Sequence, residues 1–381
     1  MMEKTVYILG AGFSMNAGAP SQAALIEEIY KLKTFNNESI KVRQWIDRLD
    51  EFLKESLYVT EGEKNQYTLE DIFTPIDRSI LENNSFRNHT PQDLTVIRDI
   101  LNRLIILAVR SAIGNSEMDQ SCVEKFAKHI LKLSKERLKD EKEDRISVIT
   151  TNWDIMLDNC VHNLIAKEKK PAGLAFSGVV DYCCYISSLE KNDDSIKPGL
   201  YAIGKGRYNV KILKLHGSLN WMQCPRCQRL YVKFYKTKKS GGYIFRNRYC
   251  RHCESNFGVK EEKANLLSAN LIMPTYLKNL NNVQNRLIWQ NAGIELSEAS
   301  KVVFLGYSLP QADFEFKQLL SRMIRKEAKI EAVLVKNDNP NEYDDSSRFQ
   351  TAGFRFENFF SGRSIKISYD GVDDYINTNC L

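Results

Sequence analysis

The sequence is most constrained by a short apolar run that ends in closely spaced glycines. Residues 6–9 read Val-Tyr-Ile-Leu, and Gly10, Gly12, Gly18 and Pro20 follow. A buried strand, a glycine turn and a helix start, in that order, are typical of phosphate binding, because glycines let backbone N–H groups approach the anion. The third glycine lies six positions after Gly12 rather than three, so an ordinary strand-turn-helix connection is the alternative.

Four further apolar runs have the length and composition of buried strands. They cover residues 146–150, 211–215, 302–305 and 332–335, and each ends in small or polar residues. The carboxyl ends of parallel strands share one edge of a sheet, where open α/β folds bind ligands. We therefore predict an α/β fold, a doubly wound, Rossmann-like parallel sheet whose ligand edge gathers these residues. The polar or small residues concerned are Thr151, Asn152, Asp154, His216, Gly306, Ser308 and Asn337.

The region between the first two predicted strands is helical in pattern. Apolar residues such as Ile97, Leu101 and Leu104 recur at three- and four-residue spacing. We interpret residues 25–145 as a large helical insertion in a single domain that spans residues 1–381.

Two C-x2-C pairs separated by 22 residues predict a metal site. Four thiolates suit a closed tetrahedral zinc site, so the metal is expected to be structural and to hold together a small zinc ribbon at 222–256. The ligands are Cys224, Cys227, Cys250 and Cys253. The tract between the pairs mixes basic and aromatic residues, which fits either a nucleic-acid contact or a solvated hairpin tip.

Composition narrows the class of protein. The chain has 381 residues, 43% of them hydrophobic, and a formal net charge of +6, which supports a nucleic-acid partner only faintly. No apolar run reaches the length of a membrane span, and Met1 to Lys4 lead directly into the first strand, so we expect a cytoplasmic protein without a membrane partner. The nine cysteines are then metal ligands and buried thiols rather than disulfides.

These motifs together resemble the sirtuin family over the beginning and the second half of the chain. The pattern G-A-G-x-S-x-x-x-G-x-P runs from Gly10 to Pro20, and T-x-N-x-D contains Thr151, Asn152 and Asp154. His216-Gly217, the paired C-x2-C motifs and the G-x-S of Gly306 and Ser308 follow in the family's order, and the late strand leads to Asn337. The resemblance implies a sirtuin-type fold with NAD at the switch point of the sheet, the nicotinamide ribose near Asn152 and His216, and the adenosine near Asn337. The cofactor-binding residues it implies are Gly10, Ala11, Gly12, Ser14, Gly18, Thr151, Gly306, Ser308 and Asn337.

Two departures from the family pattern concern the reaction. Ser21-Gln22-Ala23 follows Pro20 where protein-deacylating sirtuins carry a Phe-Arg pair, and Thr151 replaces their Gln. The missing Phe-Arg pair, the large helical insertion and the pattern G-Y-S-L-P-x-x-D from Gly306 to Asp313 together look more like the sirtuin-like effectors of bacterial anti-phage defence. That resemblance implies an NAD glycohydrolase that depletes NAD, and a HerA-type hexameric ATPase as partner. An NAD-dependent protein deacylase and a non-catalytic scaffold that binds NAD or nucleic acid are the alternatives.

The chemistry of N-glycosyl cleavage suggests roles for three residues. The Asn152 amide can hold a ribose hydroxyl and position a water, and His216 titrates near working pH and suits a general base. Asp154 either orients Asn152 or caps the following helix. Apolar faces of the helical insertion also lead us to expect a homo-oligomer.

Overall fold

The computed structural model describes residues 3–33, 40–60, 62, 67–115, 117–168, 177–191, 196, 206–235, 248–258, 263–344 and 346–380. Much of the basic and aromatic tract between the cysteine pairs, including Lys236, Lys238, Lys239, Tyr243 and Arg246, lies outside these residues. Within the described part of the chain, no helix is both long and apolar enough to cross a membrane.

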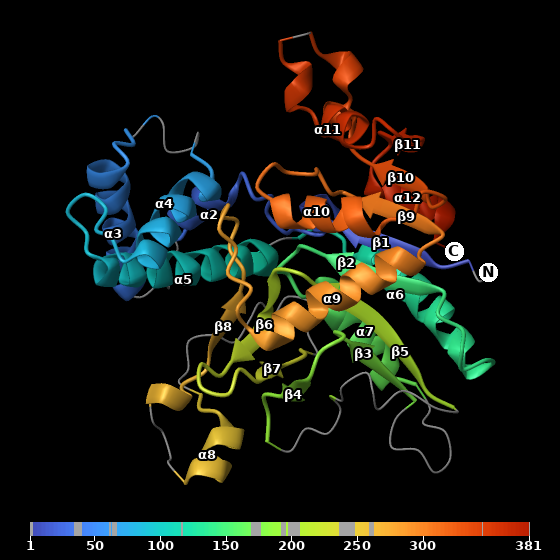
Figure 1. Ribbon diagram of the computed structural model, residues 1–381, viewed down its shortest axis with the longest axis horizontal. Coiled ribbons are helices and arrows are strands. Elements are labelled where there is room, and N and C mark those ends of the chain that lie inside the picture. Colours follow the sequence, from blue (N-terminus) through green and yellow to red (C-terminus); the bar gives the residue numbers. More distant parts are fainter. Residues whose placement is uncertain are drawn as a thin grey trace.

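A seven-stranded parallel sheet forms the centre of the molecule (Figure 1). Its order is β11-β10-β9-β1-β2-β5-β3. The strands are β1 (Thr5–Leu9), β2 (Ile146–Thr150), β3 (Gly178–Asp181), β5 (Tyr208–Lys214), β9 (Lys301–Leu305), β10 (Lys329–Val333) and β11 (Ile365–Ser368). Every pairing in this sheet is parallel. Strand β1 lies in the middle, with β2, β5 and β3 on one side and β9, β10 and β11 on the other. This confirms the predicted doubly wound sheet and adds two edge strands, β3 and β11, to the five predicted.

Helices cover both faces of the sheet. Tyr7 of β1 meets Phe126 of α6 edge to face, with ring centroids 5.1 Å apart, whereas Phe304 of β9 meets Phe356 of α11 at 5.0 Å. Because the register pairs Phe304 with Ile8 and not with Tyr7, these two aromatic side chains point to opposite faces. Helices α7 and α12 pack beside α6, and α9 packs beside α10. The helices are α6 (Ser121–Ser134), α7 (Met156–Ala166), α9 (Val283–Glu298), α10 (Phe314–Met323), α11 (Ala352–Phe359) and α12 (Val372–Asn379).

The predicted helical insertion contributes a bundle that lies beside the sheet (Figure 1). It consists of α2 (Leu25–Lys31), α3 (Ile40–Ser56), α4 (Leu69–Glu82) and α5 (Pro91–Asn115). Helix α5 contacts each of the other three, and its buried stripe includes Ile97, Leu101 and Leu104. Helix α6 and the following 3-10 helix η2 (Lys135–Leu138) pack against the sheet instead, although they fall within 25–145.

A second, four-stranded sheet carries the predicted zinc module. Its order is β4-β7-β6-β8. The elements of this part are β4 (Ile186–Ser188), β6 (Gly217–Gln223), β7 (Leu230–Val232), α8 (Arg251–Phe257), η4 (Lys263–Asn265) and β8 (Ser268–Leu271). The sequence of residues 171–207 is rich in Gly, Ser, Asp and Tyr and predicts an irregular segment, and this prediction is wrong for the residues of β3 and β4.

Candidate functional site

A cavity of about 760 Å³ opens at the carboxyl edge of the main sheet. Its wall contains residues that follow β1, β2, β5, β9 and β10, together with residues of the helical bundle. The sequence predicts a ligand site at this edge, and most of the predicted residues line the cavity. They are Ala11, Gly12, Ser14, Thr151, Asn152, Asp154, His216, Gly306 and Ser308.

Two loops pack against one another to form the floor of the cavity. The glycine turn enters the short helix α1 (Ala11–Met15). The Gly10 N–H donates to the carbonyl of Leu305, the last residue of β9, at 3.1 Å, and the Gly12 N–H donates to the carbonyl of Gly306 in the following loop at 2.9 Å. A Cβ on Gly12 would lie 2.9 Å from the Gly306 Cα, so the two backbones require glycine to approach this closely. This differs from our expectation that both N–H groups face an anion, because protein carbonyls already accept from them.

Asn152 is held at the edge of the cavity by the glycine turn. Its Nδ2 donates to the Gly10 carbonyl at 2.8 Å and to the Ser14 hydroxyl at 3.3 Å, and its backbone N–H donates to the Thr150 hydroxyl. Since the protein uses the amide nitrogen, the amide oxygen is the atom suited to accept from a ligand hydroxyl or a water. Asn152 and Ser14 are therefore brought together although 138 positions separate them in the chain.

His216 lies between β5 and β6, where Gly217 makes the turn with a positive φ of 76°. Its imidazole is buried, and Nε2 has no hydrogen-bond partner among the described residues. Burial lowers the pKa of His216, and the positive charge of Lys278 lowers it further, while Asp313 and Glu315 act in the opposite direction. The ring is therefore neutral at neutral pH and can accept a proton.

Asp313 is the partner of His216 that sequence reasoning missed. Its Oδ1 lies 3.6 Å from His216 Nε2 and 3.3 Å from Lys278 Nζ, and its Oδ2 accepts from the Tyr307 hydroxyl at 2.8 Å. The sequence offers one signal for it, a carboxylate seven residues after Gly306, at the start of α10. The sequence marks Asp313 only as the last residue of the pattern G-Y-S-L-P-x-x-D and predicts no role for it in the site.

Asp154 lines the cavity and also acts at the start of a helix. Its Oδ1 accepts from the Met156 N–H at 3.1 Å, where α7 begins. Its backbone carbonyl accepts from the buried ammonium of Lys214. The contact with Met156 lies at the start of the helix, but the N-cap residue of α7 is Ile155, so Asp154 is not its cap residue.

Three predicted residues lie outside the wall of the cavity. Gly10 lies beneath the turn, and Gly18 ends the segment after α1 with a φ of 96°. Asn337 is exposed in the 3-10 helix η5 (Lys336–Asp338), because β10 ends at Val333 rather than at 335. Its neighbour Asp338 lines the cavity instead.

The helical bundle supplies one side of the cavity, which the sequence did not predict. Tyr67, Glu70 and Val109 line it, and Gln22 joins them from the segment that precedes α2. Gln22 Nε2 donates to Glu70 Oε1 at 2.6 Å. This contact connects two residues 48 positions apart, so no local pattern shows it.

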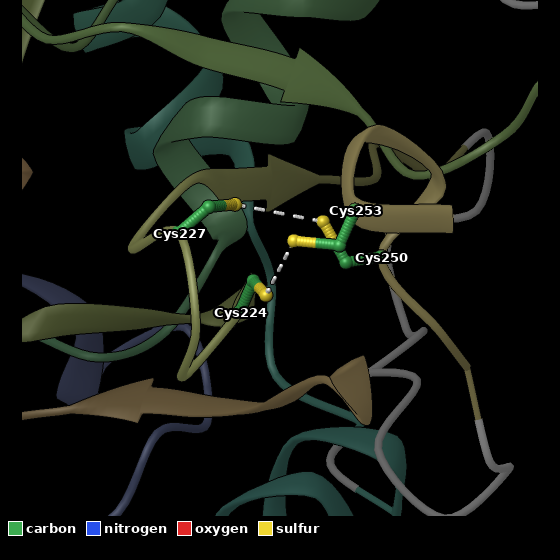
Figure 2. A group of neighbouring side chains, drawn as sticks. All are labelled: Cys224, Cys227, Cys250 and Cys253. Atoms are coloured by element: carbon green, nitrogen blue, oxygen red, sulfur yellow. Dashed lines mark hydrogen bonds between the residues drawn. The ribbon is translucent and has the colours of Figure 1, made fainter. Parts of the chain in front are cut away.

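The four predicted metal ligands form one cluster (Figure 2). All four sulfur atoms lie within 4.8 Å of one another, with 3.7 Å between the Cys224 and Cys253 sulfurs and 3.6 Å between those of Cys227 and Cys250. Tetrahedral zinc with Zn–S bonds of about 2.3 Å requires sulfurs about 3.8 Å apart, so the cluster fits this metal. None of the nine cysteines, all of which lie among the described residues, forms a disulfide.

Two described aromatic residues of the tract between the cysteine pairs, Tyr231 and Phe234, pack against other side chains. Phe234 stacks on His162 with ring centroids 4.1 Å apart, and Tyr231 is buried with its hydroxyl 3.2 Å from the Cys250 sulfur. These two side chains are therefore part of the core rather than a surface that bases stack on.

Comparisons with known proteins find similarity only among solved structures. No protein-family model matches the chain, and no curated protein matches it. A mutant Sir2 homologue in complex with ADP-ribose is 13% identical with a TM-score of 0.41, over 98% of this chain and 91% of that one. A second mutant of a Sir2 homologue with ADP-ribose is 13% identical with a TM-score of 0.42, over 98% and 90%. A complex of Sir2 with a p53 peptide and NAD+ is 14% identical with a TM-score of 0.39, over 98% and 91%. Identities and TM-scores as low as these carry no argument about function, so the function has to be inferred from the residues of the site.

Proposed function

We propose that this protein is an NAD glycohydrolase, which cleaves the bond between nicotinamide and ribose in NAD+ and releases nicotinamide and ADP-ribose. The observation that supports it best is the convergence of Ser14, Asn152 and His216 on one cavity at the switch point of the sheet. These three residues follow three different strands, and each belongs to a motif that resembles those of sirtuins.

In the proposed reaction, nicotinamide leaves with the electron pair of the C1′–N bond, and positive charge develops on the ribose. The oxygen of a water then forms a bond to C1′, and the water proton passes to Nε2 of His216. The neutral imidazole required for this step is what burial favours, and the carboxylate of Asp313 at 3.6 Å stabilises the imidazolium that forms. Asn152 holds the ribose or the water through its amide oxygen.

We also propose that the cysteine cluster binds one structural zinc ion. Four thiolates leave no open position on the metal, so it takes no part in the reaction. Its contribution is to fix β6 and β7 to α8, a region whose strands are too short to form a core of their own.

The biological role and the partners are a further part of the proposal. The motifs, the missing Phe-Arg pair and the helical bundle resemble the anti-phage effectors that deplete NAD, so we propose this role, with a HerA-type ATPase as partner and a homo-oligomeric state. Light scattering of the purified chain tests the oligomer, and co-purification from cells that express both proteins tests the ATPase. A monomeric mass or the absence of a complex would contradict the respective proposal.

The reaction class is tested by adding an acyl-lysine peptide to the purified protein with NAD+. A glycohydrolase releases nicotinamide without peptide and at an unchanged rate when it is added. Release that depends on the peptide, together with deacylated product, would instead identify a deacylase and refute the proposal.

A further inference from the structure

Glu70 is a buried carboxylate in the wall of the cavity. It belongs to the first turn of α4, where a capping box between Thr68 and Asp71 begins the helix. Its residue surface is 9% exposed, and one oxygen, Oε1, accepts from Gln22 Nε2 at 2.6 Å. The other oxygen, Oε2, is buried and has no hydrogen-bond partner among the described residues. A buried carboxylate oxygen without a partner is unfavourable unless a ligand supplies one.

The carboxylates in the wall of the cavity differ in the partners that the protein provides for their negative charge. Its wall contains the carboxylates of Glu70, Asp154, Asp313 and Asp338, and no lysine or arginine among the described residues that line it. Asp313 lies 3.3 Å from Lys278, and Asp154 accepts from a helix N–H, so these two are satisfied within the protein. Asp338 is half-exposed and interacts with the charge of Arg355.

Glu70 differs from Asp313 and Asp338 because no cation among the described residues pairs with it, and from Asp154 because one of its oxygens is buried without a hydrogen-bond partner. Burial raises the pKa of the Glu70 carboxyl, and the negative charge of Asp313 adds to the effect, while hydrogen bonds such as that from Gln22 only partly oppose it. A positive charge on a bound molecule would provide the missing partner and would keep the carboxylate ionised.

NAD+ carries one positive charge, on the pyridinium ring next to the bond that is cleaved, whereas the nicotinamide ring of NADH is neutral. We propose that Glu70 is the counter-ion of the pyridinium, and that it makes the cavity select oxidised, cationic NAD+ over NADH. This inference rests on the proposed function. It also assigns a task to the helical bundle, which contributes Glu70 to a site otherwise built on the sheet.

Isothermal titration calorimetry of the full-length protein tests the selection. The probes are NADH and a carbocyclic NAD+ analogue, which keeps the pyridinium charge but has no ring oxygen in the nicotinamide ribose and is not cleaved. We expect the wild-type protein to bind the analogue about 10- to 100-fold more tightly than NADH, as for a charge-assisted contact in a buried site. Equal affinities of the wild-type protein for the two probes would overturn the inference, whatever the behaviour of any variant.

Glu70→Gln keeps the shape of the side chain and an oxygen that accepts from Gln22, but removes the charge. It is expected to bring the ratio of the two affinities close to one, mainly through weaker binding of the analogue, and to raise KM for NAD+ more than it lowers kcat. Glu82→Gln, at the exposed end of the same helix, is the matched control and keeps the wild-type ratio. An unchanged ratio in a folded Glu70→Gln variant would also overturn the inference.

The results separate this inference from the proposed function. If both probes bind equally while the wild-type protein still hydrolyses NAD+, Glu70 is not the counter-ion and the glycohydrolase proposal stands. If neither probe binds the wild-type protein, both are wrong.

Discussion

The close packing of the two loops at the floor of the cavity leads to a quantitative prediction for Gly306→Ala. Gly306 has a φ of +60°, and a Cβ placed on it would lie 2.4 Å from the Gly12 carbonyl carbon and from the Phe13 nitrogen. Ordinary contacts of a Cβ begin at 3.4 Å, so one of the two loops has to move by about 1 Å. Both obstructing atoms belong to the backbone, and the turn cannot yield by a side-chain rotation.

Two effects contribute to the expected loss of stability. The left-handed backbone conformation costs about 1 kcal/mol for alanine, and overpacking of the two loops costs about 1 to 3 kcal/mol. The free energy of unfolding should fall by about 2 to 4 kcal/mol, which corresponds to a Tm lower by about 2 to 5 °C for a chain of 381 residues. Because the Gly10 carbonyl holds the Asn152 side chain, the shift should also lower NAD+ turnover by about 100-fold.

The assay is thermal unfolding followed by circular dichroism, together with nicotinamide release. Gly258→Ala is the matched control, because Gly258 has a left-handed φ of +69° but nothing lies within 4 Å of the point where the new methyl group would stand, so it isolates the backbone effect. Gly362→Ala, with open space and no positive φ, is the second control and should leave the Tm unchanged. If Gly306→Ala lowers the Tm no more than Gly258→Ala does, the two loops do not pack as described.

Three further predictions concern the metal and the proton acceptor. Elemental analysis should find one zinc per chain, and Cys253→Ser should lose the metal and lower the Tm; a wild-type protein that folds normally with no bound metal would contradict this. His216→Ala should lower kcat by about 100- to 10,000-fold while NAD+ still binds, and turnover close to the wild-type rate would refute its role as base. Asp313→Asn removes a charge that raises the pKa of His216, so the acid limb of the profile of kcat/KM against pH should move to lower pH, and a shift to higher pH would show that Asp313 does not act on this group.

The centre of the sheet was predictable from the sequence because buried parallel strands are continuous apolar runs. Strands β1, β2 and β9 follow that pattern, and the polar residues after them mark the ligand edge. The edge strands β3 and β11 were missed, since they have four residues each and β11 is only partly buried. Short strands of this kind are fixed by their neighbours rather than by their own composition.

The candidate site was predictable only where its residues belong to motifs. Asn152 and His216 follow strands directly, so their position at the edge of the sheet follows from the fold. Glu70 and Gln22 meet through tertiary packing of the bundle on the sheet domain. A periodic pattern of apolar residues in the sequence does not predict such a contact. The glycine turn was predicted to direct N–H groups toward an anion, but the N–H groups of Gly10 and Gly12 donate to the carbonyls of Leu305 and Gly306.

The most direct test of the central claim is the reaction of the purified protein with NAD+ alone, followed by chromatography and mass spectrometry of the products. We predict release of nicotinamide and ADP-ribose in equal amounts by the wild-type protein and by Asn358→Ala, which changes an exposed asparagine of α11 outside the cavity. Asn152→Ala, which removes the amide held by Gly10 and Ser14, should lose this release. No release by the wild-type protein, or an equal rate in Asn152→Ala, would contradict the assignment of this cavity as an NAD-hydrolysing site.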